Sequence, residues 1–254
     1  YGPRSAEDVL SVLRDSFLAG KPSRKVSQIQ PNRSLAPEKS QVFFLQKEMA
    51  QAQVRIEFAT GLYDEKKAPA GQLFNEYFGG GMAGLVFQEL REARALAYSA
   101  WAHYFNPARP NEENILVGAI GCQADKTLDA VEAFMDLLEK MPVNETRWQS
   151  AHSSILSTYR TNPIGYRSTP SFVYDVNVLG LSGDPRKNRY ETLREAEIIL
   201  LKEFYESEIS SDKKEIKILQ TQEGVEKYAR EKYNMKKENE DIYIIETDSI
   251  KPKE

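Results

Sequence analysis

The chain is poor in the residues that hold transition metals. Its 254 residues include one cysteine and two histidines, and the histidines His103 and His152 lie 49 positions apart. It has no HxxEH, HxxxH, HxH or CxxC spacing, the patterns that bring zinc ligands together on one helix or turn. The sequence therefore predicts no metal site here and no metalloenzyme activity for this chain alone.

Several other classes lack support as well. No apolar run approaches the roughly 18 residues of a membrane span, so we expect no membrane-spanning segment. A net charge of -4 argues against nucleic acid as the main partner, because phosphate binding needs a basic face. The lone Cys122 excludes an internal disulfide, and its place at the end of the apolar run 115–121 predicts a buried, inert thiol.

Nucleophilic and nucleotide-binding motifs are also missing. No serine lies in a G-x-S-x-G turn, and nothing in the sequence pairs Cys122 with a base. The glycine run 79–81 precedes a predicted helix, which suits phosphate binding, but it lacks the P-loop Lys-Ser/Thr and the dinucleotide-binding spacing. A small-ligand module built on this turn is a third, disfavoured alternative, and a nucleotide titration would test it.

What is present fits a soluble globular protein with a sizeable core, at 41% hydrophobic and 28% charged residues. We divide the chain into residues 1–40, an N-terminal helix and linker left from a preceding region, and residues 41–254, a single domain. Ser5 with Asp8 three positions on predicts the start of the first helix. Residues 20–40, rich in Lys, Arg, Ser, Gln and Pro, predict a linker on the surface.

The apolar spacing beyond residue 40 predicts an alternation of strand pairs and helices. We expect Asn144 to cap a long helix, and we expect strand 41–46 to form a hairpin with strand 51–60. The order is typical of an α+β fold, an antiparallel or mixed β-sheet with helices packed on one face. The predicted strands are 41–46, 51–60, 96–106, 113–122, 215–219 and 241–245, and the predicted helices are 68–79, 82–93, 125–141, one from 144, two or three pieces within 169–210, and 222–233.

The most informative segment runs from residue 74 to residue 99. Gly79, Gly80 and Gly81 break a helical pattern, because three glycines together end a helix. The next helix carries Arg91 near its end, and Tyr98 follows seven residues later at the start of a strand. Taken singly, Arg91 suits a solvated salt bridge and Tyr98 a core position; together with the glycine loop they indicate a site that grips a peptide carbonyl.

Strand alternation sharpens the expectation for Tyr98. With a period of two, it places Tyr98 on the same face as Ala100 and Tyr104, and places Trp101 and His103 on the opposite face. The small residues near Tyr98 leave room for a ligand. We expect His103 to be partly buried and hydrogen-bonded, and His152 to lie on a solvated helix face.

The run 75–99 contains a Gly-Gly-Gly-Met turn, the segment Phe-Gln-Glu-Leu-Arg-Glu and the segment Ala-Leu-Ala-Tyr-Ser. In these motifs it resembles the second half of pitrilysin/insulinase-type zinc metallopeptidases. Mitochondrial processing peptidase belongs to this family, and the chain looks most like the bacterial secreted or cell-envelope members. The resemblance implies a C-terminal half without zinc, which closes over an N-terminal half that carries HxxEH. That partner half lies either in the same polypeptide or in a separate subunit.

The resemblance also implies roles for individual residues. Tyr98 would donate to the scissile carbonyl or its oxyanion, Arg91 would hold a nearby substrate carbonyl, and Gly79, Gly80 and Gly81 would contribute to substrate handling. The implied substrate is a peptide, the implied cofactor is zinc in the partner half, and the implied compartment is the periplasm or cell envelope. The alternative is a degenerate, non-catalytic structural or assembly subunit of the same fold, as occurs among respiratory-complex core proteins.

Overall fold

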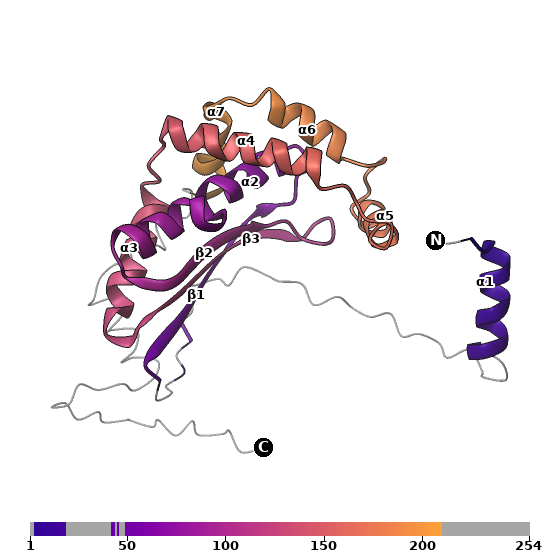
Figure 1. The fold of residues 1–254 in the computed structure, drawn as a ribbon, viewed down its shortest axis with the longest axis horizontal. Helices are drawn as coiled ribbons and strands as arrows, with labels where there is room; N and C mark the ends of the chain where they lie inside the picture. The colour runs from indigo at the N-terminus through magenta and orange to yellow at the C-terminus, as the bar shows by residue number, and fades with distance from the viewer. Residues whose placement is uncertain (1–2, 19–41, 44, 46–48, 210–254) are drawn as a thin grey trace, which may run out of the picture.

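The computed structural model describes residues 3–18, 42, 43, 45 and 49–209 (Figure 1). The linker predicted at 20–40, the domain boundary at 40/41, most of strand 41–46, strands 215–219 and 241–245 and helix 222–233 lie outside the described residues and stay predictions. The helices and strands of the described part are α1 (Ala6–Leu13), η1 (Arg14–Leu18), β1 (Gln51–Leu62), α2 (Ala68–Phe74), η2 (Asn75–Gly79), η3 (Gly81–Ala83), η4 (Phe87–Ala93), β2 (Ala97–Phe105), β3 (Glu113–Gln123), η5 (Ala124–Lys126), α3 (Thr127–Glu139), α4 (Glu145–Thr161), α5 (Thr169–Val178), α6 (Arg186–Arg194), α7 (Ile198–Phe204) and η6 (Tyr205–Ile209).

The described strands form one antiparallel sheet in the order β1-β3-β2. The predicted pairing of β2 with β3 is confirmed. Within the described part β1 pairs with β3, which the sequence did not predict. The predicted hairpin of 51–60 with 41–46 falls largely outside the described residues and stays a prediction. This register aligns the apolar Ile56 and Phe58 with Gly118 and Leu116, so their side chains share one face.

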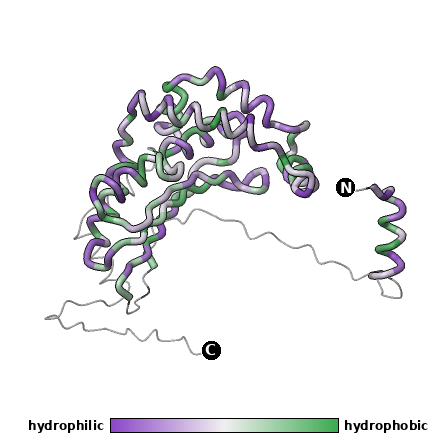
Figure 2. Tube along the Cα trace, in the orientation of Figure 1, coloured by the Kyte–Doolittle hydropathy of each residue, from purple (hydrophilic) through white to green (hydrophobic). Residues whose placement is uncertain are grey.

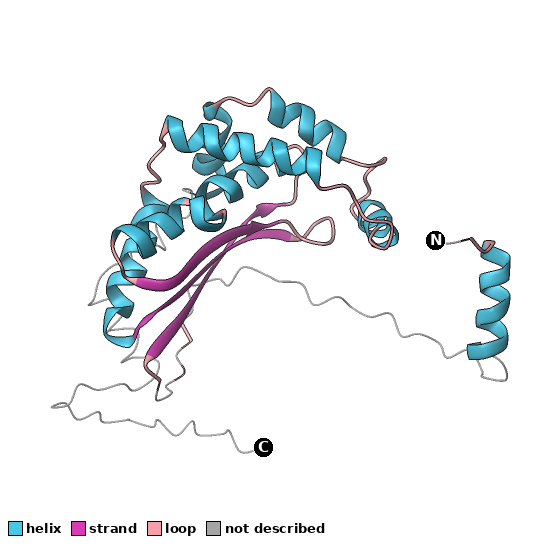
Figure 3. Cartoon of the chain, viewed as in Figure 1, coloured by secondary structure: helices cyan, strands magenta, loops and turns pink. Residues whose placement is uncertain are grey.

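The helices that cover the sheet lie on one of its faces, as Figure 3 shows, which confirms the predicted α+β architecture. The side chains of β3 that point to this covered face are buried, and Gly118 lies directly under Phe134 of α3, whose ring a Cβ at that position would meet at 2.2 Å. Cys122 is also buried here as a free thiol, as predicted. The opposite face, which we call the open face, is not covered by any described helix.

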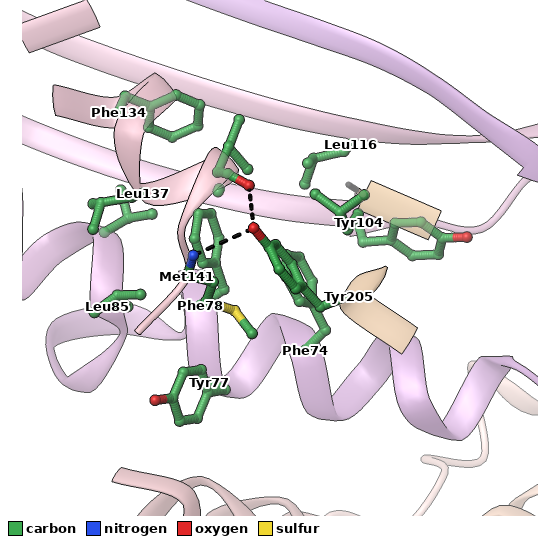
Figure 4. Packing of buried hydrophobic residues seen from close by; sticks show 14 of the residues in the cluster. Phe74, Tyr77, Phe78, Leu85, Tyr104, Leu116, Phe134, Leu137, Met141 and Tyr205 are labelled. Carbon is green, nitrogen blue, oxygen red and sulfur yellow. Dashed lines mark hydrogen bonds between the residues drawn. The ribbon is translucent and has the colours of Figure 1, made fainter. Parts of the chain in front are cut away.

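Aromatic rings fill the space between the covered face and the helices (Figure 4). Phe74 and Phe78 of the α2–η2 helix stack with ring centroids 5.0 Å apart, and Phe204 of α7 closes on Phe74 at 5.7 Å. Tyr205 donates to the carbonyl of Leu138 at 2.7 Å and accepts from the Met141 N–H at 3.3 Å. Its hydroxyl therefore ties the start of η6 to the C-terminal end of α3.

Two predicted helix starts are confirmed by their caps. The Ser5 hydroxyl accepts from the Asp8 N–H at 3.1 Å, and the Asn144 side chain accepts from the Arg147 N–H at 3.1 Å. On the outside, α6 is largely hydrophilic in Figure 2 and buries one residue, Leu193.

The prediction that His152 is solvated was wrong: its ring is half-buried because it stacks on Trp148, one helical turn away, with centroids 5.2 Å apart.

Polar side chains close one end of the sheet. Glu208 is buried and pairs with the Lys67 ammonium at 2.5 Å. The Tyr104 hydroxyl donates a hydrogen bond to Glu208 at 3.2 Å and accepts one from the Thr60 hydroxyl at 3.4 Å. Burial and the neighbouring Glu208 carboxylate raise the pKa of Tyr104 well above its usual range. The hydroxyl therefore stays protonated, and it joins β2 to the segment that follows α7.

Candidate functional site

Tyr98 lies on the open face of the sheet, not on the covered face with Ala100. The register between β2 and β3 shifts between Ala97 and Ser99: Ala97 is opposite Cys122, and Ser99 is opposite Gly121. A β-bulge places one extra residue in its strand. Because Tyr98 is that extra residue, it turns outward beside Ser99, and its side chain is 53% exposed. Strict alternation, which placed Tyr98 on the same face as Ala100 and Tyr104, was therefore wrong for Tyr98.

The Tyr98 hydroxyl has one described partner. Gln123, at the end of β3, donates its side-chain N–H to this oxygen at 3.2 Å. A phenol that accepts such a bond still has its own proton to give. Tyr98 is thus held by its neighbour strand with its donor directed away from Gln123.

Arg91 lies on the exposed side of η4, and its side chain is 47% exposed. Its guanidinium lies over the ring of Phe87, with the central carbon 4.8 Å from the ring centroid, and its Nε is 3.6 Å from a Glu92 carboxylate oxygen. The second distance exceeds that of a normal N–H···O hydrogen bond. Arg91 is therefore supported by an aromatic face while its donors remain available to a ligand.

A tight turn connects the two residues. Ala95 adopts φ +49°, a left-handed conformation that commonly ends helices, and the Leu96 N–H returns to the Leu90 carbonyl at 2.9 Å. Leu90 is fully buried, so it anchors the last turn of η4 in the core. The structure gives Arg91 and Tyr98 separate partners and describes no direct contact between them.

The glycine loop serves first to bring a helix close to a strand. A Cβ on Gly79 would lie 1.7 Å from the carbonyl oxygen of Ala102, so the end of η2 rests directly on the β2 backbone. A Cβ on Gly80 would lie 2.4 Å from the Glu76 carbonyl oxygen. At these two positions no larger residue fits without movement of the backbone.

Gly81 differs from the two glycines before it. Its φ is +56°, and a Cβ there would meet no atom within 4 Å. The following Met82 is 75% exposed. Among the three predicted glycines, Gly81 alone presents an unobstructed backbone to solvent.

Asn75 completes the contact between this helix and β2. Its side-chain oxygen accepts from the Tyr104 N–H at 2.6 Å, and its amide donates to the Tyr104 carbonyl at 2.9 Å. These are the bonds that a neighbouring strand would make, so Asn75 and Gly79 close part of the outer edge of β2. No sequence pattern indicates this contact, because residues 75 and 104 meet only in the tertiary structure.

The described residues of this chain do not fit a zinc site. His103 is in β2 and contacts the Asn75 amide through Nε2 at 3.3 Å, whereas His152 is in α4 and bonds the Leu193 carbonyl at 2.6 Å. Within the described residues no three His, Cys, Asp or Glu side chains lie together in a way that could hold a metal. Nor is any helix of the described part long and apolar enough to cross a bilayer.

A cleft of about 340 Å³ lies elsewhere, between the start of α2 and the start of α6. Its charged groups are paired with one another: Arg189 binds Glu65 at 2.6 Å, and Arg186 binds Asp184 at 3.0 Å. Burial alone would raise the pKa of Glu65, but hydrogen bonds from Arg189 and Tyr63 hold it below its usual range. None of the predicted site residues lines this cleft.

Residues 1–148 match the family model described as the peptidase M16 inactive domain. The chain belongs to this family. The description of an inactive domain agrees with our prediction that the chain alone is not an active peptidase. No curated protein matches the chain.

Solved structures share the fold of this M16 inactive domain at low sequence identity. A peptidase M16 inactive domain from Pseudomonas fluorescens has a TM-score of 0.61 at 15% identity, with 83% of this chain and 49% of that chain covered. A protease from Helicobacter pylori has a TM-score of 0.60 at 12% identity, with 81% and 50% covered. A chain of complex III2 from Candida albicans has a TM-score of 0.53 at 14% identity, with 81% and 50% covered. The chain thus spans about half the length of these structures.

Sequence reasoning found Arg91 and Tyr98 but missed the residues that support them. Phe87 lies four positions before Arg91 on a helix, and that spacing could have indicated the ring under the guanidinium. Gln123 had no such signal, because its contact with Tyr98 depends on the register of two strands and on the bulge.

Proposed function

We propose that this M16 inactive domain is the substrate-binding half of a zinc-dependent endopeptidase of the pitrilysin/insulinase type. Its open face would turn toward an HxxEH-bearing half, and a peptide would lie between the two. The observation that carries this proposal is the outward turn of Tyr98 at the β2 bulge, with a hydroxyl proton that Gln123 leaves free.

Tyr98 suits the role of a hydrogen-bond donor to the scissile carbonyl. A fixed donor directed at the oxygen where negative charge develops contributes about 3 to 4 kcal/mol to the transition state. The contact with Gln123 restricts the phenol before substrate arrives, so less conformational freedom is lost on binding.

Arg91 suits the capture of a second substrate carbonyl. A guanidinium offers several hydrogen-bond donors in a fixed plane. The Phe87 ring beneath it supports one face and leaves the edge free. Gly81, with its unobstructed backbone, is the member of the glycine loop best placed to contact a peptide, while Gly79 and Gly80 hold the loop against the fold.

The zinc centre and the water that it activates would belong to the partner half, because this chain's described residues provide no ligand set. The partner is either another part of the same polypeptide or a homologous subunit. We extend the proposal to a periplasmic or cell-envelope location, which rests on the resemblance to bacterial members of this peptidase type.

A structural subunit of an assembly is the second candidate. We include this candidate because a chain of complex III2, a protein of another kind, has a similar fold. A purely structural half has no need for an outward-facing phenol with a free proton. The two candidates therefore differ in what removal of that hydroxyl would change.

The test compares two tyrosines of the same strand in the chain assembled with its HxxEH half. Tyr98→Phe should lower kcat for a fluorogenic peptide by about tenfold or more and leave the melting temperature unchanged. Tyr104→Phe is the matched control: it removes a buried hydroxyl on the covered face, so it should lower the melting temperature while kcat per folded molecule stays the same.

Unchanged turnover in Tyr98→Phe would contradict the catalytic assignment. No cleavage by the wild-type mixture, with several candidate HxxEH halves, would favour the structural subunit. Cleavage by this chain alone would mean that the zinc chemistry has been assigned to the wrong half.

A further inference from the structure

The open face carries a row of rings along β2. Trp101, His103 and Phe105 lie at every second position and point to the same side; Trp101 is 40% exposed and Phe105 46% exposed. The His103 and Phe105 rings are in contact, with centroids 4.4 Å apart. We call these three residues the ring stripe. Single exposed apolar residues are normal on a protein surface, but a contiguous row on one strand is typical of a binding surface.

The spacing of the ring stripe matches that of an extended peptide. Alternate residues of a strand recur about every 6.8 Å on one side, and an extended peptide presents its own alternate side chains at the same repeat. The stripe begins three positions beyond Tyr98, roughly 10 Å along the strand. A peptide whose carbonyl reaches Tyr98 could therefore continue along the strand with every second side chain against a ring.

The occupied outer edge of β2 decides whether such a peptide would be recognised through its backbone or through its side chains. Asn75 occupies both backbone groups of Tyr104, and Gly79 lies against the Ala102 carbonyl. A peptide cannot add as a new strand along this stretch, because these backbone groups already have neighbours. It would have to lie on the face and be recognised through its side chains.

The charges on this face favour apolar side chains. Arg55 and Glu57 of β1 point to the open face and pair with each other at 2.5 Å. His103 accepts from the Asn75 amide through Nε2, an arrangement that requires a neutral imidazole. The ring stripe thus offers no unpaired charge to a peptide, whereas burial of an aliphatic or aromatic side chain against the rings is favourable.

We propose that the ring stripe binds an extended peptide with apolar side chains at alternate positions, next to the carbonyl held by Tyr98. This inference rests on the proposed function and gives its substrate class. The occupant is the substrate peptide, neither a second copy nor another segment of this chain.

The experiment uses Trp101 as its own reporter. The chain has two tryptophans, so Trp148→Phe leaves Trp101 as the single one. The emission of Trp101 is then titrated with two short peptides of identical leucine and serine content, one alternating and one with its leucines in a single block. Only the alternating peptide can place all its leucines on one side of an extended chain, so we expect it to shift the emission and to bind about tenfold more tightly.

Variants in the Trp148→Phe background locate the binding. Phe105→Thr keeps a residue that favours strands and removes one ring, so affinity for the alternating peptide should fall about fivefold. Tyr174→Ala removes an exposed ring from α5 and should leave affinity unchanged. Equal affinity for the two peptides, or no effect of Phe105→Thr, would overturn the proposal.

Two further outcomes would also overturn it. An emission that shifts with protein concentration alone, together with a doubled mass in sedimentation, would identify a second copy as the occupant. Protection of Trp101 from acrylamide in the free chain would mean that this chain itself covers the stripe. The titration needs no zinc half and no turnover, so failure of the stripe and failure of the Tyr98 assignment remain separate results.

Discussion

The two faces of β2 carry opposite kinds of side chain. On the covered face, Ala100 and Ala102 are small and buried, whereas on the open face Trp101 and Phe105 are large and about half exposed. A sheet that packs on one side commonly buries its bulky residues and shows small or polar ones to water. Here the small residues allow η2 to approach the backbone, and the bulky ones stand where no described helix packs. The difference suits one face to close packing within the chain, and it agrees with the peptide contact that we propose for the other.

The strongest test of this difference compares two glycines of one loop. Gly79→Ala should destabilise the chain by about 3 kcal/mol or more, because its Cβ would overlap the backbone of Ala102. Gly81→Ala should cost about 1 kcal/mol, since only its left-handed φ is strained and the space around it is open. Urea denaturation measures both. Equal losses would mean that the close approach of η2 to β2 does not contribute to stability.

A smaller effect is expected where Asn75 closes the edge of β2. Asn75→Ala leaves the N–H and C=O of Tyr104 without their partner, so the free energy of unfolding should fall by about 2 kcal/mol. Hydrogen exchange should show faster exchange of the Tyr104 amide. Gln149→Ala, at an exposed position of α4, is the control and should change stability by less than about 0.5 kcal/mol. Unaltered exchange at Tyr104 would contradict the role given to Asn75.

The smallest effect concerns pH and the open face. Partial burial lowers the pKa of His103 below its ordinary 6.5, so the folded chain resists protonation of this ring. As pH falls through about 6.5, the unfolded chain binds the proton first, and stability is lost until the pH passes below the folded pKa. His103→Gln should flatten the fall in the free energy of unfolding between about pH 7 and pH 5. An unchanged slope would show that His103 takes up its proton as easily folded as unfolded.

The sequence predicted much of the fold because the signals there are local. The apolar spacing of the α3 region, the cap at Asn144 and the apolar run of β3 each depend on residues close together in the chain. The α+β class, the β2–β3 pair and the buried Cys122 are confirmed for the same reason. The pairing of β1 with β3 was not predicted, because pairing between strands far apart in the sequence depends on which apolar faces match.

For the candidate site, too, some features follow from local sequence and others from the tertiary structure. The sequence by itself determined the residue types, with Arg91 near a helix end, Tyr98 on the next strand and a glycine break before them. Only the tertiary structure decided that Tyr98 faces outward, because a single extra residue in β2 reverses the direction of a side chain, and no local pattern marks that bulge. The tertiary structure likewise decided that Gly79 is a packing residue and Gly81 is not. A Cβ on Gly79 would meet the backbone of Ala102 in β2, whereas a Cβ on Gly81 would meet no atom within 4 Å.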